Sequence, residues 1–451
     1  MTEHLHTLPN DFLFGTATAA YQVEGAARED GRGPSIWDTF SHSPGRTFGG
    51  DTGDVSVDQY HRIDEDVALM KRMGVRAYRF SVSWSRVMPE GEGRINEAGI
   101  SYYAKLVDSL LSAGIEPWIT LFHWDLPQAL QDNYGGWQSR ETSKRFYDYA
   151  ALMASRLGDR VAHWFPMNEM FCFTVLGHRE GVHAPGLTLS QRETNQVCHH
   201  ALLGHGYGVK AIRDNAPGAR VGCAEHMHPA VPVMETEEHI DAARRAFRIE
   251  NARFLTAIVE GRYIDEYLEA EGADAPSWED GDFDLIGQPL DFIGMNMYCP
   301  SHIIADPNAP HGFRQIPTPR SYPAYHVPWL KFDPQVTYWL PRLAKEVYDA
   351  PEIYITENGA CCDDRMSPDG EVYDTDRVLY LRESLKSVSR CVKEGYPLKG
   401  YFLWSFVDNF EWAEGYSKRF GIHFCNYETK ERTPKLSAKW YREVIRRRRV
   451  V

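Results

Sequence analysis

Two glutamates stand at positions where their carboxyl groups could do acid and nucleophile chemistry. Glu357 follows a short run of β-forming residues, 353–356, and an Asn-Gly turn signal begins directly after it. Glu169 follows Asn168 at the end of another such run, 163–168. A carboxyl group at the end of a strand is held on rigid backbone, and a pair of them can protonate and attack one bond. Either glutamate alone could equally be a structural polar residue at a strand end.

Further polar and aromatic residues lie within other β-forming runs, at their ends or directly after them. They are Tyr21, Gln22 and Glu24; Arg79 and Trp84; His123, Trp124 and Asp125; Asn296, Met297 and Tyr298; and Trp404, Ser405 and the stretch Asp408-Asn409-Phe410-Glu411-Trp412. Amides and histidine both donate and accept hydrogen bonds, which suits the hydroxyl groups of a sugar, and tryptophan faces suit its apolar C–H surface. No phosphate-binding loop occurs among them. Together with two carboxyl groups, this set favours glycoside hydrolysis.

The elements that must position these residues alternate between strand and helix. Eight strands are predicted, at 12–17, 77–84, 116–122, 163–168, 221–225, 292–298, 352–356 and 401–406. Helical periodicity follows at 64–73 and 100–113, and Gly74 and Gly114 mark the ends of those two helices. Eight such units in one uninterrupted chain predict a single (β/α)8 barrel domain over residues 1–451. The long stretches 170–220, 226–290 and 299–350 are expected to supply βα-loops around the pocket, with 299–330 as one such loop.

Composition excludes several classes of function. The net charge of −14 argues against nucleic acid binding, and the basic run 446–449 is interpreted as a solvated helix end. The first residues contain no apolar segment of a signal peptide, and no run reaches the length of a membrane span. Eight scattered cysteines without C-x-x-C pairs indicate reduced thiols in the cytoplasm. Neither a cofactor nor a membrane or nucleic acid partner is expected, and the oligomeric state stays open.

The chain resembles glycoside hydrolase family 1, the β-glucosidase family, over nearly its whole length. The motifs that carry the resemblance are Phe12-Leu13-Phe14-Gly15-Thr16-Ala17 with Tyr21-Gln22-Val23-Glu24-Gly25, Tyr78-Arg79-Phe80-Ser81, Phe122-His123-Trp124-Asp125-Leu126-Pro127, Asn168-Glu169, Asn296-Met297-Tyr298, Ile355-Thr356-Glu357-Asn358-Gly359, and Trp404-Ser405 with residues 408–412. Each motif alone is weak, but their order along the chain is highly specific and agrees with the barrel.

The resemblance implies a role for each matching residue. It makes Glu169 the general acid/base and Glu357 the nucleophile of a retaining β-glucosidase that acts on terminal, unphosphorylated β-D-glucosyl residues. Carboxyl groups roughly 5–5.5 Å apart give double displacement with retention. Arg79, Tyr298 and Asn296 would support the nucleophile. The sugar would be held by Gln22, His123, Trp124, Asn168, Trp404, Glu411 and Trp412. A carboxylate at Glu411 would repel a 6-phosphate.

The departures from the family pattern lie toward the leaving group. Pro166 and Met170 replace the Thr and Pro that commonly flank the Asn-Glu pair, and His178 and Met297 replace tyrosines. Met170, His178 and Trp329 are therefore predicted on the aglycone side, with an unusual aglycone preference as the consequence. Trp329 matches the family's aglycone tryptophan only with an offset of one residue.

Other readings stay open. The same machinery would serve a β-galactosidase, a β-fucosidase or a transglycosylase. A non-catalytic sugar-binding relative would be expected to lack one of the two glutamates, and both are present. A metal site at His199, His200, His205, His226 and His228 has no supporting ligand spacing, so no metal is expected.

Overall fold

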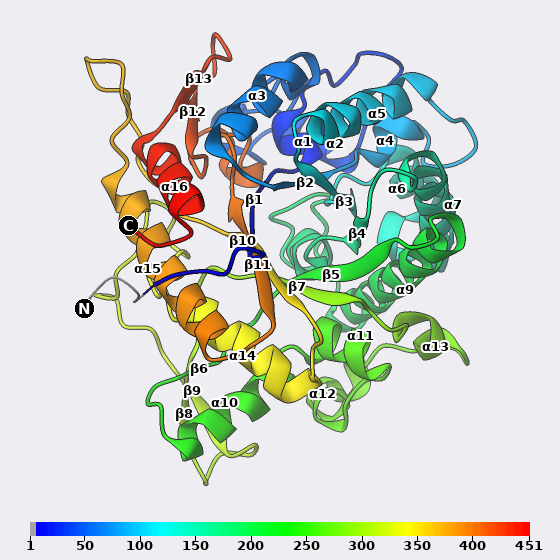
Figure 1. Cartoon of the computed structure of the whole chain (residues 1–451). Coiled ribbons are helices and arrows are strands. Elements are labelled where there is room, and N and C mark those ends of the chain that lie inside the picture. The colour runs from blue at the N-terminus through cyan, green and yellow to red at the C-terminus, as the bar shows by residue number, and fades with distance from the viewer. Residues whose placement is uncertain (1–5) are drawn as a thin grey trace.

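A closed barrel of eight parallel strands forms the centre of the molecule in the computed structural model, which describes residues 6–451 (Figure 1). The barrel strands are β1 (Leu13–Ala17), β2 (Ala77–Ser81), β3 (Glu116–Phe122), β4 (His163–Met167), β5 (Arg220–His226), β7 (Phe292–Asn296), β10 (Ile353–Asn358) and β11 (Leu398–Trp404). Each strand pairs in parallel with the next, and β1 closes the ring by pairing with both β2 and β11. The predicted (β/α)8 barrel is confirmed, with its eight strands at the predicted places.

Helices connect the strands and surround the barrel (Figure 1). The longer ones are α3 (Ile63–Met73), α5 (Glu97–Ser112), α7 (Arg140–Leu157), α9 (Gln191–Asn215), α10 (Glu237–Glu250), α14 (Val336–Tyr348), α15 (Thr375–Lys393) and α16 (Leu436–Arg447). The shorter ones are α1 (Ala20–Val23), α2 (Ile36–His42), α4 (Trp84–Val87), α6 (Gln128–Tyr134), α8 (Met170–Thr174), α11 (Ala257–Glu260), α12 (Asp265–Glu271) and α13 (Asp282–Ile286). Gly74 ends α3 with φ of 78°, a backbone angle that favours glycine, and its N–H caps two carbonyls of the last turn.

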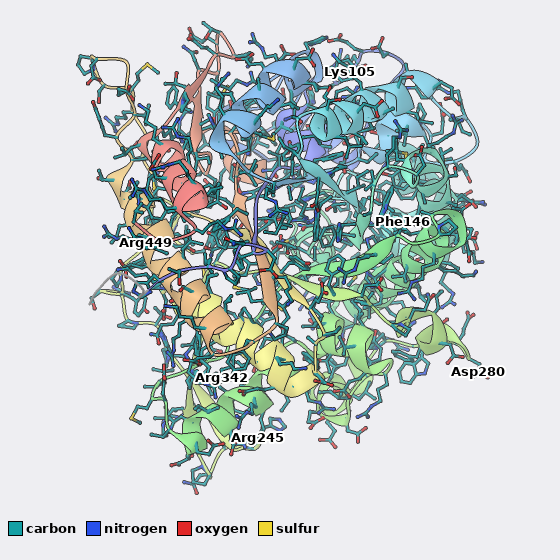
Figure 2. All side chains as sticks on the ribbon, in the orientation of Figure 1. Lys105, Phe146, Arg245, Asp280, Arg342 and Arg449 are labelled. Atoms are coloured by element: carbon teal, nitrogen blue, oxygen red, sulfur yellow. The ribbon has the colours of Figure 1, made fainter. Side chains whose placement is uncertain are left out.

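Aromatic rings fill the barrel interior below the polar end. The ring centroid of Trp118 lies 4.9 Å from Tyr354, 5.0 Å from Phe402 and 5.5 Å from Phe292, and these rings come from different strands. Side chains also fill the space between strands and helices, where Phe146 of α7 is fully buried (Figure 2). The interior is therefore a packed core, and open space is left to the carboxyl ends of the strands.

Three predicted boundaries need correction. Strand β2 stops pairing at Ser81, and Trp84 begins helix α4 instead of ending the strand. Strand β11 begins at Leu398, before the predicted 401. The stretch 170–220 is mostly helix, because Ser190 and Glu193 form a capping box that starts the 25-residue α9.

The segment 299–330 is also more ordered than the predicted loop. It contains β8 (His302–Ala305) and β9 (Phe313–Ile316), which pair as an antiparallel hairpin and join β6 (Val231–Pro232) in a three-stranded sheet. A second hairpin, β12 (His423–Cys425) with β13 (Arg432–Pro434), follows β11. Only β6 pairs with a strand from distant sequence, β8, and strands this short depend on packing against their partners more than on local composition.

Candidate active site

One cavity of about 590 Å³ opens at the carboxyl ends of the barrel strands and contains both predicted carboxyl groups. Its polar lining residues are His123, Glu169, Cys172, His183, His226, Tyr298, Cys299, Glu357, Glu411 and Glu414. Its apolar and aromatic lining residues are Trp124, Phe171, Leu176, Val182, Trp329, Trp404, Trp412, Ala413 and Phe420. The barrel thus brings side chains from residues 123 to 420 to one hollow, as expected for strand ends that share one face.

Glu357 lies in β10, and two donors hold its carboxyl group. The Nη1 atom of Arg79 donates to Oε1 at 2.7 Å, and the hydroxyl of Tyr298 donates to Oε2 at 2.9 Å. Arg79 is itself fixed by a bond from Nε to the hydroxyl of Thr120 at 3.0 Å. Burial raises the pKa of Glu357, while the charge and hydrogen bonds of Arg79 oppose that rise. Among the described residues, Glu357 is therefore the one of the two glutamates that forms an ion pair with a buried arginine.

Glu169 follows β4 and occupies a less polar environment. Its Oε2 atom faces the amide of Asn168 at 3.4 Å and the thiol of Cys172 at 3.6 Å. Burial, followed by the charge of Glu357, raises the pKa of Glu169 to about 8. The charge of Glu357 thus favours the proton on Glu169, and the charge of Arg79 favours the ionised form of Glu357. This is the division between acid and nucleophile that glycoside hydrolysis requires.

A buried chain of hydrogen bonds links the surrounding amides. Asn168 accepts at Oδ1 from Arg79 at 2.5 Å and from Asn296 at 3.0 Å. Asn296 in turn accepts from the hydroxyl of Thr356 at 2.7 Å. The Nδ2 atom of Asn168 also lies 3.2 Å from Nε2 of His123. Burial and the charge of Arg79 lower the pKa of His123 well below its usual range, so the ring is neutral and able to bind a hydroxyl group.

Gln22 is fully buried and contacts Glu411, which lines the cavity. The Nε2 atom of Gln22 donates to the carbonyl of Phe410 at 2.9 Å and to Glu411 at 3.4 Å. Its Oε1 atom is buried and has no hydrogen-bond partner within the described chain, so it can accept from a ligand. Burial and the charge of Glu357 raise the pKa of Glu411 to about 8. Both residues thus combine donor and acceptor capacity, which fits a polyhydroxylated ring.

Three tryptophans and His123 form the aromatic floor of the cavity. His123 stacks between Trp404 and Trp412, with ring centroids 5.9 and 6.0 Å away and interplanar angles of 17° in both cases. Trp124 lies 4.5 Å from Trp412. Trp404 ends β11, and the other faces come from the segments after β3 and β11. All four line the cavity that contains the two carboxyl groups.

The end of the cavity where the leaving group is predicted, called the leaving-group end below, is apolar and partly exposed. Trp329 lines it with half of its surface exposed and stacks on Phe420 at 6.3 Å. Met170 and His178, which were predicted on this side, do not line the cavity. Met170 is fully buried, and His178 points its Nδ1 atom to the carbonyl of Phe173 at 2.8 Å. The reason is that α8 begins directly after Glu169 and turns Met170 into the core, and the π-helical turn Val175–Arg179 that follows buries His178.

Several lining residues were missed from the sequence. Phe171 and Cys172 lie on α8, His226 ends β5, and Glu414 and Phe420 follow β11. Only His226 had a local signal, because it comes directly after the predicted fifth strand, but the sequence suggested it only as a possible metal ligand. The others are placed by loops whose path depends on the tertiary structure.

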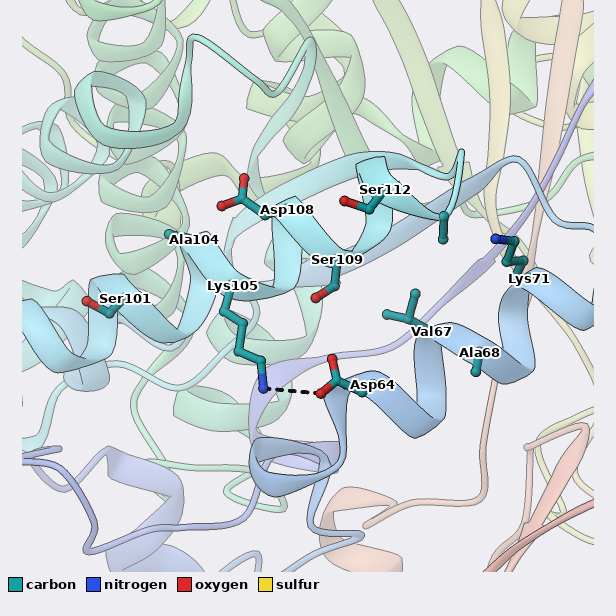
Figure 3. Close-up of a pocket in the computed structure, with 11 residues that line it drawn as sticks. Asp64, Val67, Ala68, Lys71, Ser101, Ala104, Lys105, Asp108, Ser109 and Ser112 are labelled. Carbon is teal, nitrogen blue, oxygen red and sulfur yellow. Dashed lines mark ion pairs between the residues drawn. The ribbon is translucent and has the colours of Figure 1, made fainter.

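A second hollow, of about 720 Å³, lies outside the barrel between α3 and α5 (Figure 3). Small side chains such as Ala68 and Ala104 line it, and Lys105 pairs with Asp64 across it at 3.5 Å. It is larger than the barrel cavity but is an open groove on the surface without a buried acid. Size alone therefore misidentifies the site, whereas the two buried carboxyl groups identify it.

The described part of the chain offers little else that could serve as a binding centre. No three histidine, cysteine, aspartate or glutamate side chains between residues 6 and 451 gather in a way that could hold a metal ion. None of the described helices combines the length and apolar character needed to cross a membrane.

Comparisons with known proteins agree with this geometry. Residues 4–450 match the family model described as glycosyl hydrolase family 1. Beta-glucosidase A from Acetivibrio thermocellus is 43% identical over 444 residues, which cover 98% of each chain. A bifunctional beta-D-glucosidase/beta-D-fucosidase from Bifidobacterium breve is 41% identical and covers 97% of this chain and 98% of its own. The structure of beta-glucosidase from Thermotoga maritima in complex with glucoimidazole superposes with a TM-score of 0.89 at 41% identity, covering 98% of this chain and 99% of that one.

Proposed function

This chain belongs to glycosyl hydrolase family 1, and from that premise we propose that it is a retaining, exo-acting β-glucosidase with Glu169 as acid/base and Glu357 as nucleophile. The observation that carries the proposal is the contrast between two carboxyl groups in one cavity. Glu357 accepts hydrogen bonds from Arg79 and Tyr298, whereas burial keeps the proton on Glu169. The two groups are therefore already divided into base and acid before substrate arrives.

The reaction follows from this division. Glu357 attacks the anomeric carbon while Glu169 gives its proton to the glycosidic oxygen, so that the bond to the aglycone breaks and a glycosyl ester forms. Glu169, now ionised, takes a proton from a water molecule. That water attacks the anomeric carbon, glucose leaves with its β configuration retained, and Glu357 returns as carboxylate.

The sugar would lie over the aromatic floor with its hydroxyl groups toward Gln22, His123, Asn168 and Glu411. Trp124, Trp404 and Trp412 would support its apolar face, and Asn296 would hold Asn168 in place. The hydrogen bond from Asn168 is expected to strengthen as charge develops in the transition state. Trp329 would contact the aglycone.

An unphosphorylated sugar fits the charges of the site. Among the described residues that line the cavity, none is lysine or arginine, while Glu169, Glu357, Glu411 and Glu414 are acidic. A phosphate dianion on the 6-hydroxyl would thus enter without a cation to pair with it. Hydrolysis of a 6-phospho-β-glucoside without hydrolysis of the free β-glucoside would contradict this point.

The decisive experiment is the Glu357→Ala variant on an activated aryl β-glucoside, with and without azide. Without azide the variant is expected to lose at least about 10⁴-fold in kcat, because the covalent step is removed. With azide it should release the α-glucosyl azide, since the small anion replaces the carboxylate on the same face. Undiminished activity would remove Glu357 from the nucleophile role.

A β-fucosidase activity is the second candidate. It is supported by the bifunctional relative described above, and a fucosyl ring lacks the 6-hydroxyl that the Gln22–Glu411 end of the site would bind. Comparing kcat/KM for 4-nitrophenyl β-D-glucoside and β-D-fucoside tests it. A β-galactosidase or transglycosylase on the same machinery would appear in the same panel, with galactoside turnover or with transfer products.

We also assign the enzyme to the cytoplasm. All eight cysteines are unpaired, and seven of them are buried. Free buried thiols are typical of proteins in reducing compartments. Fractionation of the native host cells, with detection by antibody, would test this assignment.

A further inference from the structure

Two residues at the carboxyl end of β5, Glu225 and His226, contact the acid/base loop and have no part in the reaction described above. Glu225 is buried and His226 lines the cavity. We propose that they form a positioning unit for Glu169, in which Glu225 holds the backbone and His226 faces the carboxyl group. This inference rests on the proposed role of Glu169 as acid/base.

The backbone at Glu169 needs support because its conformation is unfavourable. Its φ of 45° lies in the left-handed region, which costs energy for a residue with a side chain. Two hydrogen bonds to β5 hold it there. The N–H of Glu169 donates to the carbonyl of Ala224 at 2.8 Å, and the N–H of Met170 donates to Oε2 of Glu225 at 3.1 Å.

Glu225 supplies an acceptor that no backbone carbonyl provides at this point. Helix α8 starts at Met170, so the N–H of that residue is one of the unpaired donors of a first helical turn. The other oxygen of Glu225, Oε1, is buried without a partner among the described residues. Burial raises the pKa of Glu225 well above its usual range, so it acts as a neutral acid and adds no charge beside Glu169.

His226 contacts Glu169 from the other side. Its Nδ1 atom lies 3.8 Å from Oε1 of Glu169, whereas Asn168 and Cys172 both donate to Oε2. Because both donors face Oε2, the proton of the acid form belongs on Oε1, the oxygen toward His226. The imidazole is thus placed beside the atom that must release and regain the proton.

Neighbouring rings fix the orientation of His226. It stacks on Phe171 at 5.4 Å with an interplanar angle of 23°, and the edge of His228 contacts it at 5.3 Å. His226 and Phe171 line both the main cavity and a neighbouring cavity of about 440 Å³, which is distinct from the groove between α3 and α5. Burial and the nearby His228 lower the pKa of His226 to about 3, so the ring is neutral during turnover.

Only a few groups lie close enough to Glu169 to affect its pKa or the position of its carboxyl group. The titratable and charged groups around it are Arg79 on β2, Cys172 on α8, Glu225 and His226 on β5, and Glu357 on β10. The amide of Asn296, at the end of β7, also hydrogen-bonds to it. Arg79 bonds to Glu357 and to Asn168. Support of the acid/base from the β5 side is therefore left to Glu225 and His226.

The test compares two substrates that differ in their need for protonation. In 2,4-dinitrophenyl β-D-glucoside the leaving group departs as a stable anion, whereas the sugar leaving group of cellobiose must be protonated. For Glu225→Leu, kcat/KM on cellobiose should fall at least about tenfold, with the activated substrate unchanged within about twofold. Glu225→Gln keeps an oxygen acceptor for Met170 and should restore near-normal values on both substrates.

His226→Phe retains the stacking on Phe171 but removes the ring nitrogen. We expect a three- to tenfold loss of kcat/KM, roughly, on cellobiose only, because positioning of the acid matters less than its presence. His228→Phe is the matched control, because its ring contacts His226 without facing Glu169, and it should change neither substrate. Equal losses on both substrates, or an undiminished rate on cellobiose, would overturn the inference.

Glu169→Ala, measured in the same series, separates this inference from the function on which it rests. If Glu169→Ala shows a large loss confined to cellobiose while Glu225→Leu and His226→Phe do not, only the positioning unit fails. If Glu169→Ala itself shows no such selectivity, the acid/base assignment fails.

Discussion

The two ends of the cavity differ in how completely their polar groups are paired. At the nucleophile end, Glu357, Arg79, Asn168 and Asn296 form a continuous buried network with distances of 2.5 to 3.0 Å. At the leaving-group end, Trp329 is half exposed and packs against aromatic rings. A paired network holds one geometry, whereas stacked rings tolerate several ligands. The difference indicates an enzyme that is strict for the sugar and permissive for the aglycone.

The largest effect should come from breaking the network at Arg79. Arg79→Met leaves the carboxylate of Glu357 buried and unpaired, which should lower the free energy of unfolding by about 3–5 kcal/mol and kcat by at least about 10²-fold. Urea unfolding and kcat on an aryl glucoside measure both. Arg86→Met is the matched control, because Arg86 forms a similarly buried pair with Glu24 at 2.8 Å.

The control should lose similar stability but keep kcat within about tenfold of the wild type in the folded fraction. If the two variants lost kcat equally, the role of Arg79 would be structural, and the paired network would not distinguish the nucleophile end from the rest of the barrel.

The next largest effect is expected in the pH dependence of kcat/KM, which reports the protonation of Glu169. Because the pKa of Glu169 is raised to about 8, the acid form is present below that pH and is lost above it. We therefore expect kcat/KM on cellobiose to fall about tenfold per pH unit above pH 8. The activated substrate, whose leaving group departs without the proton, should show no such limb in the wild type or in Glu169→Gln. An alkaline limb that persisted in the variant would belong to another group.

The ionisation of Glu411, at the sugar-binding end, should make the stability of the protein depend on pH. Its pKa is raised to about 8 in the folded protein, so the folded state binds a proton that the unfolded chain releases near pH 4.5. Stability from this group is full below pH 4.5 and is lost as the pH rises toward 8, at up to about 1.4 kcal/mol per unit. Glu411→Gln should flatten the decline of Tm between pH 5 and 8. An unchanged slope would contradict the raised pKa.

The smallest effect is expected at Trp329. Trp329→Ala should change kcat/KM by about two- to tenfold, depending on the aglycone, because an exposed stacking face contributes about 1–2 kcal/mol at most. Inhibition by glucose, which needs only the sugar site, should stay the same. A panel of β-glucosides with alkyl, aryl and sugar aglycones measures the effect. A wild type that hydrolysed only one of these aglycone classes would contradict the permissive leaving-group end.

Much of this molecule could be predicted from local sequence. Alternating β-formers and glycine stops placed all eight barrel strands, because side-chain periodicity and backbone preference act within a few residues. Polar residues after the strands pointed to Glu169, Glu357 and Arg79, since a barrel brings its strand ends to one face. The motif order, and with it the family, likewise depends only on the sequence.

Tertiary structure alone decided the leaving-group end. Met170 and His178 are close to Glu169 in sequence, yet α8 buries the first and the π-helical turn after it buries the second. Phe420, in contrast, reaches the cavity from far along the chain. Loop paths depend on long-range packing rather than on neighbouring residues, so proximity in sequence misled the prediction there. The same holds for Glu225 and His226, whose contact with Glu169 exists only because β5 pairs beside β4 in the closed barrel.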